Sequence, residues 1–263
     1  MTTTRLGLAA AFPPDTLHAL EGLLGAMADD ELVLGYWDSE WTGIAPMLEE
    51  DVAMSSLAQD EIGHARALYA LLGELRDEDP DHLAYDRDVA DLRHARLLDH
   101  PRTDWAFSIA RRWLYDEADA VRLEALAGSA FSPLAELVGK IRREEVYHRL
   151  HATAWLRRLA DADGEPRERL LAAWRTLLPD AATVFTPLDG EQRLVAAGVI
   201  AATNGELETR WRQDIGGTCR ELGLAVPGPA ADPMHGRTTH GEAVAWLWGE
   251  ATMVRRLDPE ATW

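Results

Sequence analysis

Apolar side chains recur three or four positions apart through most of the chain, and no five-residue stretch alternates strongly between apolar and polar residues. A period near 3.6 is that of an amphipathic helix. Between residues 46 and 75 the apolar positions that follow this period are Leu48, Val52, Leu57, Ile62, Leu68 and Leu72. The pattern therefore predicts an all-α fold.

Prolines and glycines interrupt the helical pattern and set the expected boundaries. We expect a loose arm over residues 1–14, and a short helix that begins at Asp15 or Thr16 and ends near Gly25. The predicted longer helices cover residues 28–41, 46–75, 104–127, 133–160, 166–178, 189–203, 205–222 and 240–256, with one more around 86–98. This order predicts a four-helix bundle over residues 28–160, preceded by the N-terminal segment 1–27 and followed by a helical extension, 161–263, packed on the bundle.

Two Glu-x-x-His motifs stand out among the polar positions. Glutamate and histidine three residues apart share one face of a helix, so both can reach a single metal ion. An acidic residue precedes each motif at nearly the same distance, about 30 residues. The six predicted metal ligands are Glu31, Glu61, His64, Asp116, Glu145 and His148.

A breaker lies midway between each early acid and its motif, at Pro46 in the first half and at 128–133 in the second. Each half should therefore fold as a helical hairpin that brings acid and motif level. Two such hairpins face to face offer four carboxylates and two imidazoles, the ligand set of ferritin-like dinuclear proteins. These donors suit two iron ions, or manganese.

Neighbouring acids leave alternatives within this set. Glu117 is an alternative to Asp116, and Glu144 is an alternative to Glu145, although only Glu145 has a histidine three residues on. Histidine ligands are commonly held by an outer carboxylate. The candidates for that role are Asp60 and Asp119.

Other histidines lie outside the motif pattern. We expect His82, His94 and His100 at the surface, and His151 beside the metal ligands or at the surface. His235 and His240 raise the alternative of a second metal site, but a surface loop is favoured. The single cysteine, Cys219, excludes an intrachain disulfide and is expected to be a buried or idle thiol.

The formal charge of −19 and the pI near 4.8 argue against binding to nucleic acid or to an anionic membrane surface. No stretch approaches the roughly 20 apolar residues of a membrane span. We therefore expect a cytoplasmic protein. The only lysine is Lys140, so contacts with the phosphates of a coenzyme A thioester would fall mainly to arginine.

From residue 28 to its C-terminus the chain resembles the ferritin-like A and C subunits of the bacterial phenylacetyl-CoA epoxidase. The segments similar to the C subunit are Ser39-Glu40-Trp41, Ala45-Pro46, Leu48-Glu49, the Gly236 to His240 stretch, and Arg255 to Trp263. The segments of this chain that are similar to the A subunit are Gln59-Asp60-Glu61, Gly63-His64, Trp113-Leu114, Asp116, and Glu144-Glu145 with His148.

The resemblance implies that the six predicted ligands match the family's iron ligands one by one. It further implies an O₂-dependent di-iron monooxygenase that forms an epoxide on an aromatic CoA thioester, with electrons from a separate reductase. The implied partners are an A-type oxygenase subunit and a small bridging subunit, within a dimer or higher oligomer.

The family's C subunit is generally a structural partner with a decayed metal site, whereas this chain keeps every ligand type. It is therefore either catalytic within the complex or a non-catalytic partner. An iron store or peroxidase is the third alternative.

Overall fold

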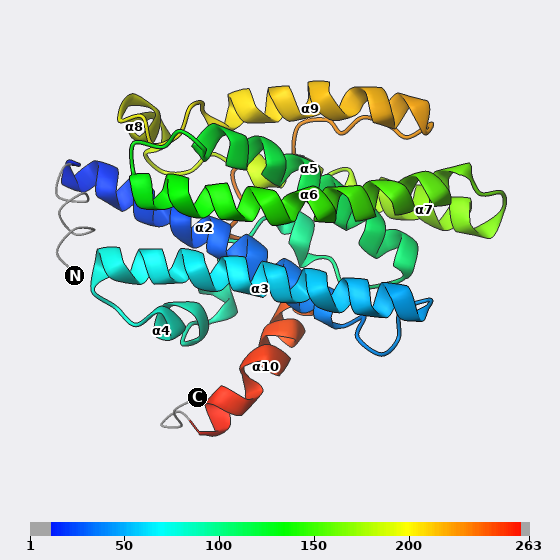
Figure 1. Cartoon of the computed structure of the whole chain (residues 1–263), viewed down its shortest axis with the longest axis horizontal. Coiled ribbons are helices and arrows are strands. Elements are labelled where there is room, and N and C mark those ends of the chain that lie inside the picture. The colour runs from blue at the N-terminus through cyan, green and yellow to red at the C-terminus, as the bar shows by residue number, and fades with distance from the viewer. Residues whose placement is uncertain (1–11, 259–263) are drawn as a thin grey trace.

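The computed structural model describes residues 12–258 as helices joined by loops, and no strand occurs in that range (Figure 1). The α-helices are α2 (Pro14–Ser39), α3 (Leu48–Arg76), α4 (Pro80–Tyr85), α5 (Trp105–Leu126), α6 (Ser132–Asp161), α7 (Glu165–Leu177), α8 (Glu191–Ala196), α9 (Asn204–Glu221) and α10 (Glu242–Leu257). Short 3₁₀ helices are η1 (Val89–Asp91), η2 (Arg96–Asp99) and η3 (Ala181–Phe185). The all-α prediction is confirmed, and the architecture is consistent with a ferritin-like bundle.

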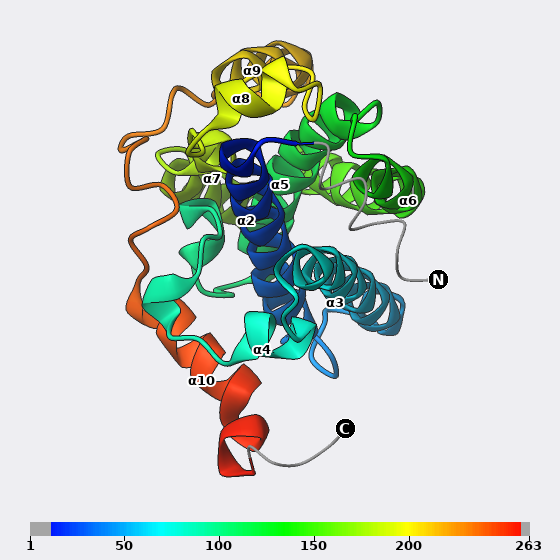
Figure 2. The same cartoon turned by 90° about the vertical axis from the view of Figure 1, so that its left-hand side faces the viewer.

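The bundle consists of two antiparallel hairpins, α2 with α3 and α5 with α6 (Figure 1). Helices α7 and α9 pack on α5, and α10 projects from the opposite side of the molecule (Figure 2). One continuous apolar core runs through the hairpins and into α7 and α9. The metal-site motifs lie on α3 and α6, in the middle of this packing.

The predicted break between a short first helix and residues 28–41 is wrong, because α2 is continuous. Ala26, Met27 and Ala28 are buried in the core, and a Cβ at Gly25 would meet Leu72 of α3 at 3.8 Å. Packing against α3 thus outweighs the weak helix propensity of Gly25. A loose arm was predicted over residues 1–14, and residues 1–11 of that segment lie outside the described range.

Two further helices were predicted too long. The segment 189–203 contains only α8, and Gly198 adopts φ +70° just beyond it. The segment 86–98 is not an α-helix but contains η1 and the start of η2. Two of its backbone N–H groups bond to side chains of α2 and are lost to a helix, since Arg93 N donates to Asp29 at 2.6 Å and Ala95 N donates to Asp30 at 2.7 Å. The remaining helix ends agree with prediction to within about two residues.

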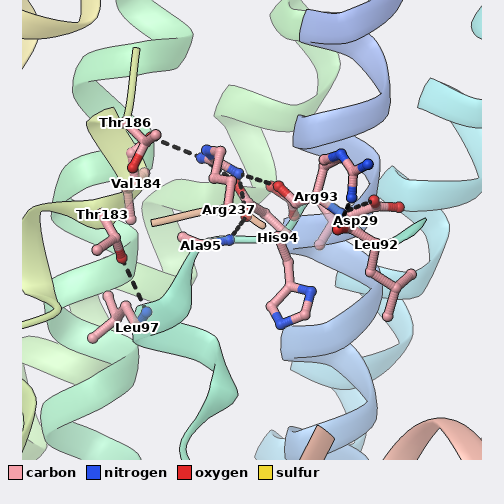
Figure 3. Close-up of polar contacts among 12 residues, drawn as sticks. Asp29, Leu92, Arg93, His94, Ala95, Leu97, Thr183, Val184, Thr186 and Arg237 are labelled. Atoms are coloured by element: carbon pink, nitrogen blue, oxygen red, sulfur yellow. Dashed lines mark hydrogen bonds and ion pairs between the residues drawn. The ribbon is translucent and has the colours of Figure 1, made fainter. Parts of the chain in front are cut away.

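Arg237 ties four segments of the chain together beneath the surface. Its guanidinium donates two 2.9 Å hydrogen bonds to Asp30, and others to the carbonyls of Arg93 at 2.8 Å and Val184 at 2.7 Å. Figure 3 shows Arg237 reaching between the η3 segment and the crossover, the segment 77–104 that joins α3 to α5. Burial opposes ionisation of Asp30, but Arg237 and Arg122 outweigh it and lower the pKa of that carboxyl. The loop before α10 is thereby fixed to α2.

Replacing Arg237 with Met should lower the free energy of unfolding by about 3–5 kcal/mol, because it leaves Asp30 buried with one fewer cation. The measurement is urea denaturation followed by circular dichroism. Arg157→Met is the matched control, because it breaks an arginine–carboxylate pair with Glu221 at the exposed surface and should change little. Equal midpoints for the two variants would contradict this account.

Candidate metal centre

Four side chains converge in the middle of the bundle from three helices. They are Glu31 of α2, Glu61 and His64 of α3, and Glu145 of α6, each no more than 4% exposed. One donor atom from each lies within 4.8 Å of the other three. This is the spacing of ligands around one metal ion.

Local sequence explains how the helices present these groups. The three-residue spacing puts Glu61 and His64 on one face of α3. Gly35, one turn after Glu31, lies where α2 meets that face, since a Cβ there would stand 2.8 Å from Ile62 Cγ1 and 3.0 Å from Glu61 Cβ. The missing side chain lets α3 approach α2 closely enough for the two glutamates to meet.

The donor atoms of this group lie close to one another in the interior. His64 Nδ1 lies 3.4 Å from Glu31 Oε2 and 3.7 Å from both Glu61 Oε2 and Glu145 Oε1. All four atoms are buried, and none makes a well-oriented hydrogen bond within residues 12–258. Leaving such atoms unpaired is costly. Carboxylates with an imidazole fit a divalent ion such as iron or manganese, so this part of the predicted site fits a metal.

Outer carboxylates hold both histidines, and they do so across the two hairpins. Glu144 of α6 contacts His64 Nε2 at 2.7 Å, and Asp60 of α3 contacts His148 Nε2 at 3.2 Å. Each acid stands just before the glutamate of its own motif and contacts the histidine of the other. With Nε2–H donated to a carboxylate, Nδ1 of each ring faces the cluster.

Asp60 was one of two acids expected in this outer role, and its contact with His148 agrees with that expectation. The other, Asp119, is instead paired with Arg122 at 2.6 Å. Glu144 was expected only as an alternative to Glu145, so its contact with His64 of the opposite hairpin was not predicted.

Arg112 of α5 lies on the other side of the cluster and was not predicted to be part of it. Its Nη2 lies 2.5 Å from Glu61 Oε1 and 2.9 Å from His148 Nδ1. Its Nε lies 3.5 Å from Asp116, and Nη1 donates to Asp38. The sequence feature that could have indicated Arg112 is its position one helical turn before Asp116, on the same face of the helix.

All six predicted ligands are therefore buried in one cluster, but they divide into two groups. Four of them bring one donor atom each to within 4.8 Å of the others, whereas Asp116 and His148 contact Arg112, and His148 Nδ1 also lies 3.0 Å from Glu145 Oε1. Glu117, the alternative to Asp116, pairs with Arg149 at 2.7 Å. The four grouped residues fit one ion, and the guanidinium of Arg112 lies beside them, between Glu61 and His148. Metal binding by any of the six remains a prediction.

The electrostatics of the cluster favour bound protons when no metal is present. Burial, with the charges of Glu61 and Asp119, holds the pKa of Glu31 well above its usual range. Burial opposes protonation of His64, yet the neighbouring carboxylates of Glu31 and Glu61 outweigh it and raise the pKa of His64 to about 12. A metal ion must displace these protons.

A second group of potential ligands, His94, Asp99 and His240, lies between the crossover and the loop before α10. The prediction that His94 is a surface residue is wrong, and so is the surface-loop prediction for His240, because both side chains are buried. Their rings stack at 4.1 Å, and both contact Asp99. His240 Nε2 also lies 2.8 Å from the carbonyl of Leu92. Hydrogen bonds already engage these groups, so the cluster fastens the loop to the crossover.

Five other histidines lie away from the metal centre, and His18 on α2 is one of them. His82 and His235 are exposed and contact Asp86 and Asp232, while His100 and His151 are partly buried and contact Asp180 and Glu50. Cys219 is buried, as expected, and burial raises the pKa of its thiol to about 11.

A cleft of about 440 Å³ opens beside the centre, between α5, α6 and α9. Glu145 forms part of its wall, so the cleft leads from the surface to one of the four clustered residues. Arg142 and Arg149 also line it, together with the indole of Trp113.

The model of the phenylacetic acid catabolic protein family matches residues 9–263. The chain is 28% identical over 239 residues to the C subunit of 1,2-phenylacetyl-CoA epoxidase from Escherichia coli (strain K12), covering 90% of this chain and 96% of that relative. It is 26% identical over 213 residues to the A subunit of the same epoxidase, covering 78% of this chain and 68% of that relative. Within residues 12–258, no helix has both the length and the apolar character needed to cross a membrane.

Metal affinity should rise with pH between pH 6 and 8, because His64 and Glu31 bind protons that the ion displaces. The expected gain is roughly tenfold per pH unit for each proton released. Titration calorimetry with Mn²⁺ in two buffers of different ionisation enthalpy measures the protons released. An affinity that is the same at pH 6 and pH 8 would contradict the prediction that His64 and Glu31 hold protons before the ion binds.

Proposed function

Because the chain belongs to the phenylacetic acid catabolic protein family, we propose that it is a subunit of a multicomponent oxygenase of the phenylacetyl-CoA epoxidase type. Such a complex acts on an aromatic CoA thioester in phenylacetate catabolism. The observation that carries this proposal is the match to the epoxidase C subunit, which spans nearly the whole of both chains. A cytoplasmic location, expected from the sequence, accompanies the proposal as a prediction.

The partner in this proposal is an A-type oxygenase subunit, joined by a small bridging subunit and supplied with electrons by a reductase. Helix α10 offers an apolar surface for such a partner. Its residues Trp246, Met253, Val254 and Leu257 are at least half exposed. Exposed apolar side chains grouped on one element are typical of interaction surfaces.

Iron is the metal proposed for the four-residue centre, with manganese as the alternative. When bound, it would supply redox chemistry toward O₂. Glu31, Glu61, His64 and Glu145 would hold the ion, and Glu144 would fix the ring of His64. The buried setting of these residues, each at most 4% exposed, keeps bulk water away from them.

The cleft beside Glu145 is the proposed approach for the thioester. Guanidinium groups bind phosphate through paired hydrogen bonds, and Arg142 stands on its wall, together with Arg149, which is paired with Glu117. The Trp113 side chain gives the same cleft an aromatic surface. These features support a coenzyme A ligand on a chain whose net charge is −19.

Substitution of the α10 surface should weaken assembly with the A-type subunit. For the double variant Met253→Glu/Leu257→Glu we expect at least a tenfold loss of affinity, because two charges would enter an apolar interface. The measurement is calorimetric titration of the purified subunits. Glu165→Ala, an exposed position at the start of α7 and away from α10, is the control and should bind as the unaltered chain does. Unchanged affinity of the double variant would reject α10 as the contact.

A second candidate function is monooxygenase catalysis by this chain itself, favoured by the burial of all six ligand-type residues in one cluster. The test supplies the iron-loaded chain with reductase, O₂ and phenylacetyl-CoA, both by itself and with the A-type subunit. The partner-subunit proposal predicts product only when the A-type subunit is present. Product formed by this chain alone, and lost in Glu61→Gln, would establish catalysis here instead.

A further inference from the structure

One side of the buried cluster contains a fixed cation, the guanidinium of Arg112, and among the described residues no guanidinium donates a hydrogen bond to the donor atoms on the other side. We propose that Arg112 stands in for a second metal ion, so that the centre binds one ion per chain. This inference deepens the proposed function and rests on it for the identity of the metal. Its basis is the set of contacts that the guanidinium makes with groups otherwise suited to bind metal.

On its own side of the cluster, Arg112 engages the donor atoms that an ion would need. Nη2 lies within hydrogen-bond distance of Glu61 Oε1 and His148 Nδ1, which are themselves 3.2 Å apart. A guanidinium N–H can only donate, and Glu61 Oε1 accepts from it, while His148 Nδ1 lies close to the same oxygen and at 3.0 Å from Glu145 Oε1. Metal–ligand bonds are about 2.0–2.2 Å long, and an ion at that distance would compete with Nη2 for the same two atoms.

Two further carboxylates, those of Asp38 and Asp116, also hold Arg112 in place. Asp38 of α2 accepts a hydrogen bond from Nη1, and the Arg112 side chain is only 1% exposed. Asp116 lies one turn along α5 and contacts Nε at 3.5 Å. Three helices thus supply a carboxylate to one guanidinium, from Asp38, Glu61 and Asp116. A buried cation with these partners is part of the packed interior rather than a mobile side chain.

On the opposite side of the cluster no guanidinium within residues 12–258 donates a hydrogen bond to the four donor atoms that would hold the ion. Glu61 separates the two positions, since Oε1 faces Arg112 while Oε2 faces His64 and has no hydrogen-bond partner among the described residues. Glu61 therefore links one guanidinium to one metal position, in the way that a bridging carboxylate links two ions. In this proposal His148 pairs with Arg112 and, at 3.0 Å, with Glu145 Oε1, and it does not bind the ion, although it matches His64 in spacing and in its outer carboxylate.

The experiment compares the two histidines, using the full-length chain purified alone and titrated with Mn²⁺. The unaltered chain should bind one ion and show the electron paramagnetic resonance signal of an isolated Mn²⁺. His64→Ala should weaken binding by more than about 100-fold, the upper loss for an outer partner. His148→Ala should still bind one ion within about tenfold of the original affinity, since the proposal gives that ring no ligand role.

Two results would overturn the inference. One is binding of two ions by the unaltered chain, with an exchange-coupled signal. The other is loss of the ion in a folded His148→Ala variant, since a dinuclear site would need that ring. Because the unaltered chain is measured directly, the inference is tested even if a variant fails to fold.

A second pair of variants examines Arg112 itself. Arg112→Gln combined with Asp38→Asn removes a buried cation and a buried anion together, and this variant should bind two ions. Arg111→Gln is the control, because Arg111 is equally buried but donates to the carbonyl of His100 outside the cluster, and it should still bind one. A folded double variant that binds only one ion would show that Arg112 does not exclude the second.

Assembly with the A-type subunit is measured on the same preparations. A chain that binds no ion but assembles would refute the one-ion inference and leave the proposed function standing. A chain that binds one ion but does not assemble would refute the proposed function instead.

Discussion

Burial of carboxylates inside a helical bundle is the constraint on which the rest of this structure depends. Within residues 12–258 eight are buried, namely Asp29, Asp30, Glu31, Asp38, Glu61, Asp116, Asp119 and Glu145. An isolated charge in such an interior is unstable unless it is paired, protonated or bound to a metal. Buried arginines supply part of the compensation, at positions 111, 112, 122 and 237. The clustered carboxylate oxygens of the metal centre are among those that these arginines leave unsatisfied, together with oxygens of Asp38, Asp116 and Asp119.

The same need for partners shapes the connections between helices. Asp29 and Asp30 follow one another on α2, and both accept backbone N–H groups from the crossover. The crossover cannot give these groups to α2 and also use them in a helix of its own, which explains its extended course and short 3₁₀ turns. The loop before α10 is fixed to Asp30 through Arg237. Acids outside the metal centre therefore organise the chain around it.

Much of this arrangement follows from local sequence. Motif spacing and proline positions predict α3, α5 and α6 closely, and they bring the six ligand-type residues into one cluster. The sequence does not reveal Arg112 as a partner, because an arginine on a helix usually reaches solvent and only the packing of three helices shows that this one does not. Burial of His94 and continuity of α2 were missed for the same reason: contacts with distant segments decide them. The division into a bundle over residues 28–160 and a C-terminal extension remains a prediction.

The crossed pairs Glu144–His64 and Asp60–His148 have a consequence for assembly of the fold. Helices α3 and α6 belong to different hairpins, so neither hairpin alone contains a histidine together with its outer carboxylate. A slide of α6 along α3 by one turn, about 5.4 Å, would break both pairs at once. The two contacts thus fix the axial register of the hairpins, and the cluster is completed only when they dock in that register.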